Sequence, residues 1–287
     1  MRNSFIALCM AFAAILLISC DTEYAANGKE EMVVEGWIDE GDFPVVILTK
    51  SLVVTDKYQE ADSLLQYLIR WARVTVSDGE KIVVLTGKYS PQYFPPYVYT
   101  TGQMRGEAGK TYTLDVEYGD FHATATTTIP EKHVIEQVMA EPCAASDTLY
   151  QLKIKVNTDK ARGAYYQLFT CEGTSNRLFV ASYLGTIDGS SLRANAEIPV
   201  YRSHRLATGK KYTPYFCSQD TLAIKLAHID ASSYSFWSDY SRNLTLAGNL
   251  FMAPTRNVRT NVKGATGYWC GMGADVKYVV IGDAVGK

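Results

Sequence analysis

Residues near the start of the chain have the types and the spacing for one covalent modification. The chain reads Leu17, Ile18, Ser19, Cys20, with a bulky aliphatic residue three positions before the cysteine and a small residue directly before it. Bacterial lipoprotein signal peptidase accepts this pattern and cuts in front of the cysteine, whose thiol carries lipid. The sequence therefore predicts a signal peptide over residues 1–19, cleavage between Ser19 and Cys20, and a lipid anchor on Cys20.

The residues before Cys20 have the composition of an export signal. Arg2 is the only charged residue among them, and residues 5–18 are almost wholly apolar. The apolar run is too short to cross a bilayer comfortably, as is typical of the core of a signal peptide. The alternative is an ordinary secretory signal in which Cys20 is incidental. The end of the apolar run at the cysteine favours the lipid anchor.

Two acidic residues follow the lipidation site. Asp21 and Glu23 resemble the short export signal that carries Bacteroidetes lipoproteins to the outer face of the outer membrane. The alternative is a plain solvated tether, because the segment is small, polar and contains glycine. We expect residues 20–31 to form a lipidated tether that anchors the protein in the outer membrane. The cell surface is the expected location, and the periplasmic face is the alternative.

The other groups that could do chemistry are scattered. The four histidines stand far apart, with no H-E-x-x-H or other close metal spacing. No G-x-S-x-G turn exposes a serine nucleophile. The run "GEAGKT" (residues 106–111) enters a β-rich segment where a phosphate loop needs a helix, so we expect a hairpin turn there. The sequence predicts a protein without catalytic residues, metal or cofactor. The enzymatic alternative is a glycan hydrolase, which needs two carboxylates converging on one cleft.

Four cysteines remain in the mature chain: Cys143, Cys171, Cys217 and Cys270. An exported protein can pair them, and four cysteines allow three disulfide connectivities. Buried thiols are the alternative. The spacings are long and contain no C-x-x-C, which argues against a zinc site.

An aromatic stretch is the most unusual candidate for a binding surface. In "YSPQYFPPYVYT" (residues 89–100), three prolines hold aromatic residues in an extended loop. Aromatic faces can stack on a sugar ring or on the apolar side chain of a partner, and the alternative is a loop that folds its aromatics onto the core. We take Tyr93, Phe94, Tyr97 and the turn at Trp269 as candidate contacts with a ligand or partner.

Three D-[ST]-L tripeptides resemble the O-glycosylation acceptor pattern of exported Bacteroidetes proteins. Their hydroxyl residues are Ser63, Thr148 and Thr221. Tripeptides recur by chance and acceptors must be exposed, so a mass shift on the intact mature protein is the test.

The elements that must position these groups are mostly strands. Short runs rich in Val, Ile, Thr and Tyr, broken by Asp-Gly and Gly-Asp, predict an immunoglobulin-like β-sandwich over residues 32–130. A helix is expected over residues 59–71, with a core-facing stripe that includes Leu68 and Trp71. Residues 131–143 are expected to link this sandwich to a second set of strands.

A second β-rich domain is expected over residues 131–287. Runs such as "YQLKIKVNT", "GAYYQLFTC" and "TLAIKLAHID" predict antiparallel strands. Tyr234, Trp237 and Tyr240 or Ser241 have helical spacing, and Ser232 or Ser233 precedes them as a candidate cap. The predicted fold is thus mostly β, with one or two short helices.

Composition narrows the functional classes. The chain has 287 residues with 28 basic and 30 acidic side chains, and a formal net charge of −2 at pH 7. This balance excludes a typical nucleic-acid-binding protein. With 47% hydrophobic residues the chain can bury a proper core, and its length suits two domains.

The order of these parts resembles a known family. The lipid-anchor signal, "MVVEGWI", "ARVTVSDG" and the C-terminal stretch "NLFMAPTRNVRTNVKGATGYWCGMG" together resemble the Bacteroidetes lipoproteins called domain of unknown function 4249. The C-terminal signature consists here of Asn249, Phe251, Pro254, Val258, Asn261, Val262, Gly264 and Gly267. Members often read "GGLGIFGGY" where this chain has "KGATGYWCGMG", so Gly271 and Gly273 also fit while the apolar residues between them differ. These glycines are expected at turns that need positive φ or close backbone approach.

The resemblance implies a fold and a role. Family members have an N-terminal sandwich similar to carboxypeptidase-regulatory or transthyretin-like modules and are typically encoded beside TonB-dependent outer-membrane receptors. The expected function is a non-catalytic accessory lipoprotein that helps such a receptor to capture or admit a nutrient, whether a glycan, a peptide or another ligand. A fimbrial or adhesive surface lipoprotein is the alternative, and a glycan-active enzyme is a third.

Overall fold

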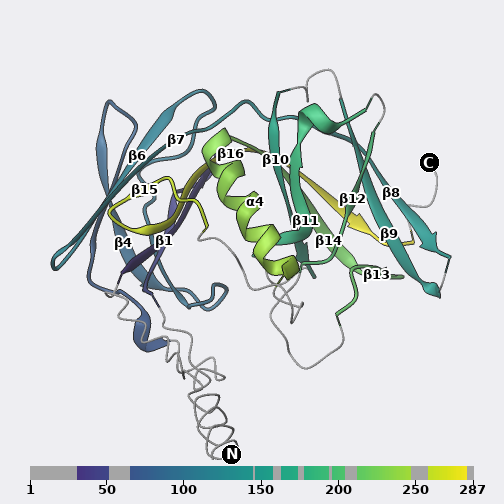
Figure 1. The fold of residues 1–287 in the computed structure, drawn as a ribbon, viewed down its shortest axis with the longest axis horizontal. Coiled ribbons are helices and arrows are strands. Elements are labelled where there is room, and N and C mark those ends of the chain that lie inside the picture. The colour runs from purple at the N-terminus through teal and green to yellow at the C-terminus, as the bar shows by residue number, and fades with distance from the viewer. Residues whose placement is uncertain are drawn as a thin grey trace, which may run out of the picture.

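The protein consists of two β-sandwich domains side by side, with one long helix packed at their junction (Figure 1). The structure is a computed structural model that describes residues 31–51, 65–144, 146–157, 163–173, 178–193, 196–203, 212–246 and 258–282. Within these residues most of the chain is strand, so the mostly β fold class expected from the sequence is confirmed.

The first sandwich uses the alternating runs of the N-terminal part. Its strands are β1 (Met32–Asp39), β2 (Val45–Lys50), β3 (Arg73–Ser77), β4 (Ile82–Tyr89), β5 (Tyr97–Thr100), β6 (Thr111–Tyr118) and β7 (Phe121–Thr128). In β1 every second side chain is buried, as period-two alternation requires when one face packs on a core. Val34, Val74 and Leu114, from different strands, meet in this core.

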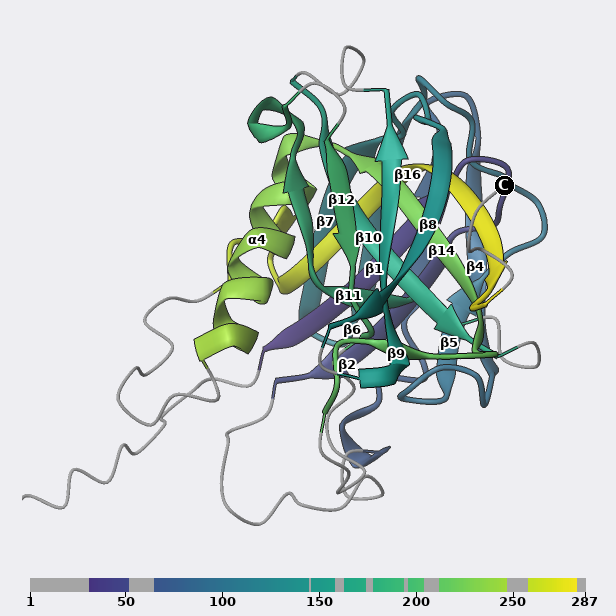
Figure 2. The same ribbon diagram turned by 90° about the vertical axis from the view of Figure 1, so that its right-hand side faces the viewer.

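The second sandwich follows a short connection. Its strands are β8 (Ile135–Cys143), β9 (Ser146–Val156), β10 (Tyr165–Glu172), β11 (Val180–Asp188), β12 (Glu197–Val200), β13 (Phe216–Cys217) and β14 (Thr221–Ile229). Two short 3-10 turns also occur: η1 (Leu65–Tyr67) in the first domain and η2 (Gly189–Ser191) in the second. Figure 2 views the molecule from the side of this second domain. Leu152, Tyr166 and Ile224 belong to its core.

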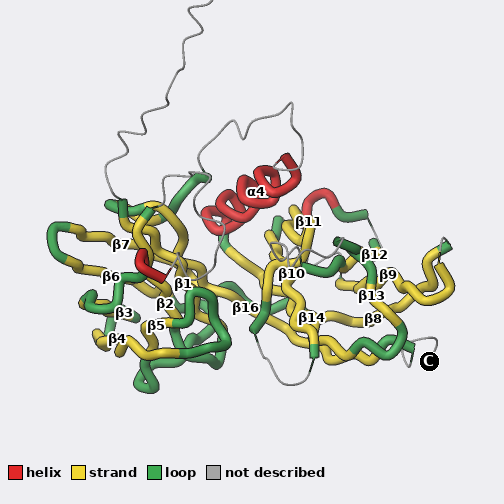
Figure 3. The backbone as a smooth tube through the Cα atoms, turned by 90° about the horizontal axis from the view of Figure 1, so that it is seen from below, coloured by secondary structure: helices red, strands yellow, loops and turns green. Residues whose placement is uncertain are grey.

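The C-terminal strand is shared between the two domains (Figure 3). The first part of β16 (Thr266–Val280) pairs in parallel with β1, from Thr266 opposite Val33 to Met272 opposite Asp39. The second part pairs antiparallel with β14, from Gly273 opposite His228 onward. The short β15 (Val262–Lys263) pairs with β7. Residues 262–272, which the sequence pattern placed in the second domain, therefore complete the first sandwich.

Polar contacts also join the domains. Lys225 on β14 and Asp39 on β1 form an ion pair, and the ammonium group is almost fully buried. The Thr127 hydroxyl donates to Asp230 at 2.9 Å and accepts the backbone N–H of Gly271 at 2.8 Å. Removing one partner of a buried ion pair leaves an uncompensated charge, which is strongly destabilising. The ion pair and the hydrogen bonds of Thr127 therefore stabilise the position of one domain relative to the other.

One predicted helix is confirmed, with a different cap. The helix α4 (Ala231–Leu246) packs Trp237 against Phe169 of β10 and Tyr268 of β16. Its N-cap is Asp230, whose carboxylate accepts the backbone N–H of Ser233 at 2.7 Å and the hydroxyl of Ser232 at 2.7 Å. The prediction of a serine cap is wrong because Asp230, two residues before Ser232, supplies the acceptor.

The other predicted helix is not supported where the structure describes it. Residues 59–64 lie outside the described residues, and the rest contains only the 3-10 turn η1. Trp71 is 87% exposed and Leu68 half-buried, so the prediction that Trp71 belongs to a core-facing stripe is wrong. The chain leaves the helical spacing here because Leu68 bridges to Thr49 and Ile69 bonds to Leu48, which extends the sheet.

Two segments read as linkers or loops are strands. Residues 131–143 include β8, which pairs with β9 alone and is exposed along much of its length. An edge strand of this kind carries Glu, Gln and Pro without clean alternation, which hides it in the sequence. Residues 97–100 of the aromatic stretch form β5. The "GEAGKT" run is a turn, but it joins β5 to β6, which pair with other strands, so it is not a hairpin.

In the described part of the chain, no helix is both long enough and apolar enough to cross a membrane.

Candidate partner-binding surface

The first strand, β1, begins at the end of the first sandwich that lies away from the second domain (Figure 1). Met32, the first residue of β1, pairs with Lys50, and the Thr49–Leu68 bridge lies one step inward. The opposite end of β1 holds Asp39, which contacts the second domain through Lys225. We call the end that contains Met32 the tether end.

Two tyrosines of β5 hold the chain segment that leads into β3. The Tyr99 hydroxyl donates to the carbonyl of Ile69 at 2.9 Å and accepts the N–H of Ala72 at 3.0 Å. Burial raises the pKa of Tyr99 to about 12, so the phenol stays protonated and can donate. The Tyr97 hydroxyl donates to the carbonyl of Arg70 at 3.0 Å. Trp71, between these anchored residues, is thus presented to solvent by a fixed backbone.

Gly87 makes room for this arrangement. A Cβ atom at Gly87 would lie 2.4 Å from the Tyr97 hydroxyl oxygen. The Tyr97 side chain therefore passes directly over β4 on its way to Arg70. Tyr89, two residues after Gly87, pairs with Tyr97 and is 70% exposed.

The loop between β4 and β5 adds a third exposed aromatic residue. The N–H of Ser90 donates to the carbonyl of Pro96 at 3.1 Å and closes the loop. Within it, Phe94 is 55% exposed. Trp71, Tyr89 and Phe94 together form what we call the exposed aromatic set.

The structure places the predicted contact residues in different environments. Phe94 is exposed, as a contact residue must be. Tyr93 is half-buried, with its ring 6.0 Å from that of Trp37, and burial raises its pKa. Tyr97 is half-buried and holds Arg70. Trp269 is 0% exposed, so the prediction that it contacts a ligand at the surface is wrong.

Trp269 is a core residue of the first sandwich. Its indole N–H donates to the carbonyl of Tyr112 at 3.0 Å, which satisfies the polar atom of a buried ring. The Asn261 side chain donates to the Trp269 carbonyl at 2.7 Å and accepts its N–H at 3.0 Å. Trp269 and the signature residue Asn261 thus have structural roles.

The signature glycines are required by close backbone approach. A Cβ at Gly267 would lie 1.8 Å from the Val34 carbonyl oxygen, and one at Gly264 would lie 2.1 Å from that of His122. Gly273 approaches the Pro130 carbonyl in the same way, and Gly271 packs on Ile129 and its neighbour. Both Gly264 and Gly267 also have positive φ. The expected close backbone approach is confirmed at these four positions, but only Gly264 lies in a turn, because Gly267, Gly271 and Gly273 are inside β16. Asn249, Phe251 and Pro254 lie outside the described residues.

The structure joins none of the four cysteines by a disulfide. Cys171 and Cys270 are buried, Cys143 is half-buried and Cys217 is exposed. Burial raises the pKa of the Cys270 thiol far above its usual value. Cys171 and Cys270 match the alternative of buried thiols, whereas Cys143 and Cys217 are free thiols that are not buried.

Thiol labelling tests this arrangement. We expect the mature protein, unfolded without reductant, to take up alkylating reagent at all four cysteines, because none is oxidised. In the native protein Cys217 should react quickly and Cys270 only on unfolding, since reactivity requires exposure and thiolate. Mass spectrometry of the labelled peptides measures both. A pair of cysteines that reacts only after reduction would contradict the structure.

The glycosylation candidates differ in accessibility. Ser63 lies outside the described residues, Thr148 is exposed, and Thr221 is half-buried. Thr221 lines a shallow cavity of about 410 Å³ with Glu172, Gly173, Gln219 and Asp220. Of the three candidates, Thr148 alone meets the exposure requirement within the described chain.

The same cavity contains two carboxylates, Glu172 and Asp220, and a glycan hydrolase would need such a pair. Arg202 binds both acids: its Nε is 3.2 Å from Glu172 and its Nη2 is 2.7 Å from Asp220. Asp220 also accepts the backbone N–H of Cys217 at 2.7 Å. The two carboxylates therefore neutralise an arginine and support a turn, which is a structural use of this pair.

Tertiary structure also assembles groups that no sequence spacing reveals. His133 and His228 lie 4.6 Å apart between ring centroids, beside Tyr166 at the domain junction. Asp115, Glu117 and His122 gather on the first sandwich. Trp71 and Tyr89 join the exposed aromatic set, although the sequence predicts only Phe94 of the three as a contact. Their one signal is position, since Trp71 stands at the end of the run expected to be a helix and Tyr89 at the end of a strand-like run.

The fold and this surface define a class of protein: a two-domain β-sandwich protein whose C-terminal strand completes the N-terminal domain. The family model Domain of unknown function (DUF4249) matches residues 18–277. The chain belongs to this family, as the signature predicted. No curated protein matches the chain.

Proposed function

We propose that this protein is an outer-membrane lipoprotein, anchored through Cys20, that assists a TonB-dependent receptor in nutrient capture without catalysis. The observation that carries the proposal is the exposed aromatic set on the domain to which the tether is attached. Large exposed aromatic residues are enriched among the contacts that dominate binding energy at protein interfaces.

The length of the tether supports a membrane partner. Residues 20–31 span at most about 40 Å when fully extended. The tether joins β1 at Met32, so the tether end of the first sandwich stays near the membrane surface. Trp71 and Tyr89 lie at that end, within reach of the extracellular part of a receptor embedded in the same membrane. The second domain extends away from it and is free to meet a ligand.

The sheet arrangement weighs against the fimbrial alternative. Strand exchange needs both a strand that can leave its sheet and an edge that accepts it. β1, the first strand after the tether, pairs with β2 on one side and with β16 on the other. Releasing it would expose two rows of backbone hydrogen-bonding groups and open the core of the first sandwich.

Alanine substitution of the exposed aromatic set tests the proposal. We expect the triple change Trp71→Ala, Tyr89→Ala and Phe94→Ala to reduce recovery of the receptor with the tagged lipoprotein from detergent-solubilised outer membranes by at least about tenfold, because each anchor residue contributes on the order of 1–2 kcal/mol. Stability should change by less than about 0.5 kcal/mol per site, since the side chains are exposed.

The matched control replaces Tyr278, which is 76% exposed on the second domain, with alanine. Recovery of the receptor should then be unchanged. A receptor that co-purifies equally with the triple variant would contradict the role of this surface, and the wild-type protein recovered alone, or in a ladder of itself, would contradict the receptor partnership.

A further inference from the structure

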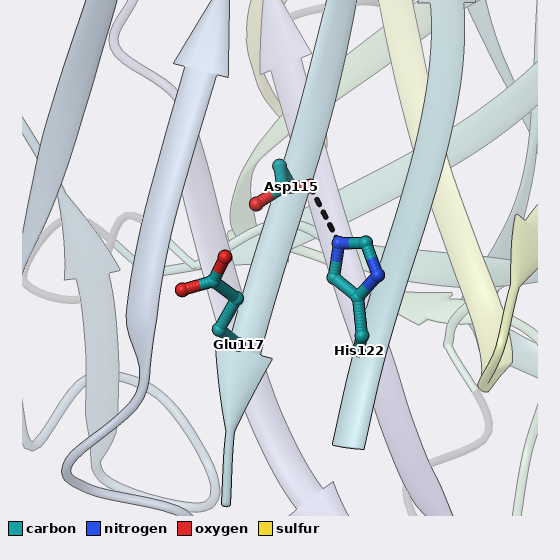
Figure 4. Close-up of side chains that lie close together, drawn as sticks. All are labelled: Asp115, Glu117 and His122. Atoms are coloured by element: carbon teal, nitrogen blue, oxygen red, sulfur yellow. Dashed lines mark hydrogen bonds and ion pairs between the residues drawn. The ribbon is translucent and has the colours of Figure 1, made fainter. Parts of the chain in front are cut away.

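Three side chains of types that can bind a metal ion meet on the outer face of the first sandwich (Figure 4). Asp115 and Glu117 stand two residues apart on β6, so their side chains leave the same face of the strand. His122 on β7 is directly opposite Glu117 in the antiparallel register. Directly opposed residues of an antiparallel pair project to one face, and this brings the three groups together.

The donor atoms are already close to one another. One carboxylate oxygen from each acid and one ring nitrogen of His122 all lie within 4.8 Å of each other. His122 Nε2 is 2.8 Å from Asp115 Oδ2. Glu117 and His122 are exposed and Asp115 is half-buried, so the side facing solvent is open to water or to a further ligand.

The donor set has the chemistry of a transition-metal site rather than of a plain acidic patch. Zinc binds imidazole nitrogen and carboxylate oxygen at about 2.0–2.2 Å, which places neighbouring ligands of a tetrahedral ion about 3.3 Å apart. The cluster has to contract by on the order of 1 Å at its widest separation, a movement within reach of exposed side chains. An imidazole ligand favours zinc and related ions over calcium and magnesium, which prefer oxygen ligands alone.

Two basic side chains lie near this cluster, and one of them would compete with a metal ion for Glu117. Arg73 on β3 pairs with Glu117 in the sheet, and its Nη1 is 3.1 Å from the Glu117 carboxylate. Lys263 of β15 pairs with Thr124, the residue opposite Asp115, and adds a second positive charge to this part of the face. Arg73 orients Glu117 in the absence of metal, and the metal has to take the place of this ion pair.

We infer that Asp115, Glu117 and His122 form a binding site for one divalent transition-metal ion of the zinc class, with water or a partner's group completing the coordination. The site is independent of the receptor partnership and of the exposed aromatic set. It needs no side chain outside the two strands of one hairpin.

Calorimetric titration of Zn²⁺ into the metal-free mature chain tests the inference. The protein carries Cys217→Ser, because the exposed thiol of Cys217 is itself a zinc ligand, and a purification tag without histidine. We expect one ion per chain in this background. Either His122→Gln or Asp115→Asn should weaken binding by at least about tenfold, a loss that even changes to residues behind the ligands cause at metal sites. Binding to Arg73→Gln should be tighter than to the parent, because the competitor for Glu117 is gone.

The matched control is Asp120→Asn, which removes the same charge from the turn of the same hairpin without touching a donor. Its zinc affinity should equal that of the parent. Circular dichroism of each metal-free variant checks that the hairpin is folded. The inference is overturned if zinc does not bind, if His122→Gln binds as tightly as the parent, or if Mg²⁺ binds as well as Zn²⁺, which would indicate a simple attraction to negative charge.

Discussion

Replacing Trp269 with alanine is expected to lower the free energy of unfolding of the mature protein by about 3–5 kcal/mol. Its indole has no exposed surface and packs in the core of the first sandwich. A Cβ at Gly36 would lie 2.8 Å from the Trp269 ring, which shows how closely β1 approaches it. Alanine would leave a cavity there and remove the hydrogen bond from the indole to the Tyr112 carbonyl.

Urea unfolding followed by circular dichroism measures this loss, because fluorescence would change with the tryptophan itself. The matched control is Trp71→Ala, which removes the same side chain from an exposed position. It should change stability by less than about 0.5 kcal/mol. Equal effects of the two substitutions would contradict the burial of Trp269. The result also separates two roles for tryptophan, since only Trp71 is expected to affect partner binding.

The second large effect is expected at Gly267. Alanine there should cost about 3–5 kcal/mol, from the strain of a positive φ together with overpacking. Gly267 has φ of 123° and stands opposite Val34 in the parallel pair of β1 and β16. A Cβ would lie 1.8 Å from the Val34 carbonyl oxygen, so one of the two strands has to move.

Substitutions at two control glycines separate the cost of the backbone conformation from the cost of the close contact. Gly41 has φ of 80°, and a Cβ added there would have nothing within 4 Å, so Gly41→Ala should cost only about 1–2 kcal/mol for its backbone conformation. Gly102 has open space and no positive φ, and Gly102→Ala should lie within about 0.5 kcal/mol of the parent. Denaturant unfolding of the three variants gives the order. A loss at Gly267 no greater than that at Gly41 would contradict the close approach of β1 and β16.

Both predictions concern the strand pair that makes the fold one unit. The first half of β16 completes the N-terminal sandwich and the second half continues in the sheet of the other domain. A defect at Trp269 or Gly267 therefore acts on the N-terminal domain although both residues lie near the C-terminus. In the described part of the family signature, the glycines allow close backbone approach and Asn261 holds Trp269 in place.

Much of the first sandwich can be predicted from the sequence alone. The strands β1, β6 and β7 bury every second side chain, a period that depends only on local geometry. The helix α4 is predictable because Tyr234 and Trp237 share one face at helical spacing. The family follows from the C-terminal signature. Local periodicity and motif order are written in neighbouring residues, so they need no tertiary information.

Tertiary structure alone decided which distant residues meet. The parallel pairing of β1 with β16 joins segments more than 200 residues apart, and it makes Trp269, a predicted surface contact, a core residue. The same folding exposes Trp71, which the helical spacing places on a core-facing stripe. It also places His122 opposite Glu117, which no spacing motif describes. Sheet register depends on the free energy of the whole packed core, and a sequence read along one dimension does not contain that pairing explicitly.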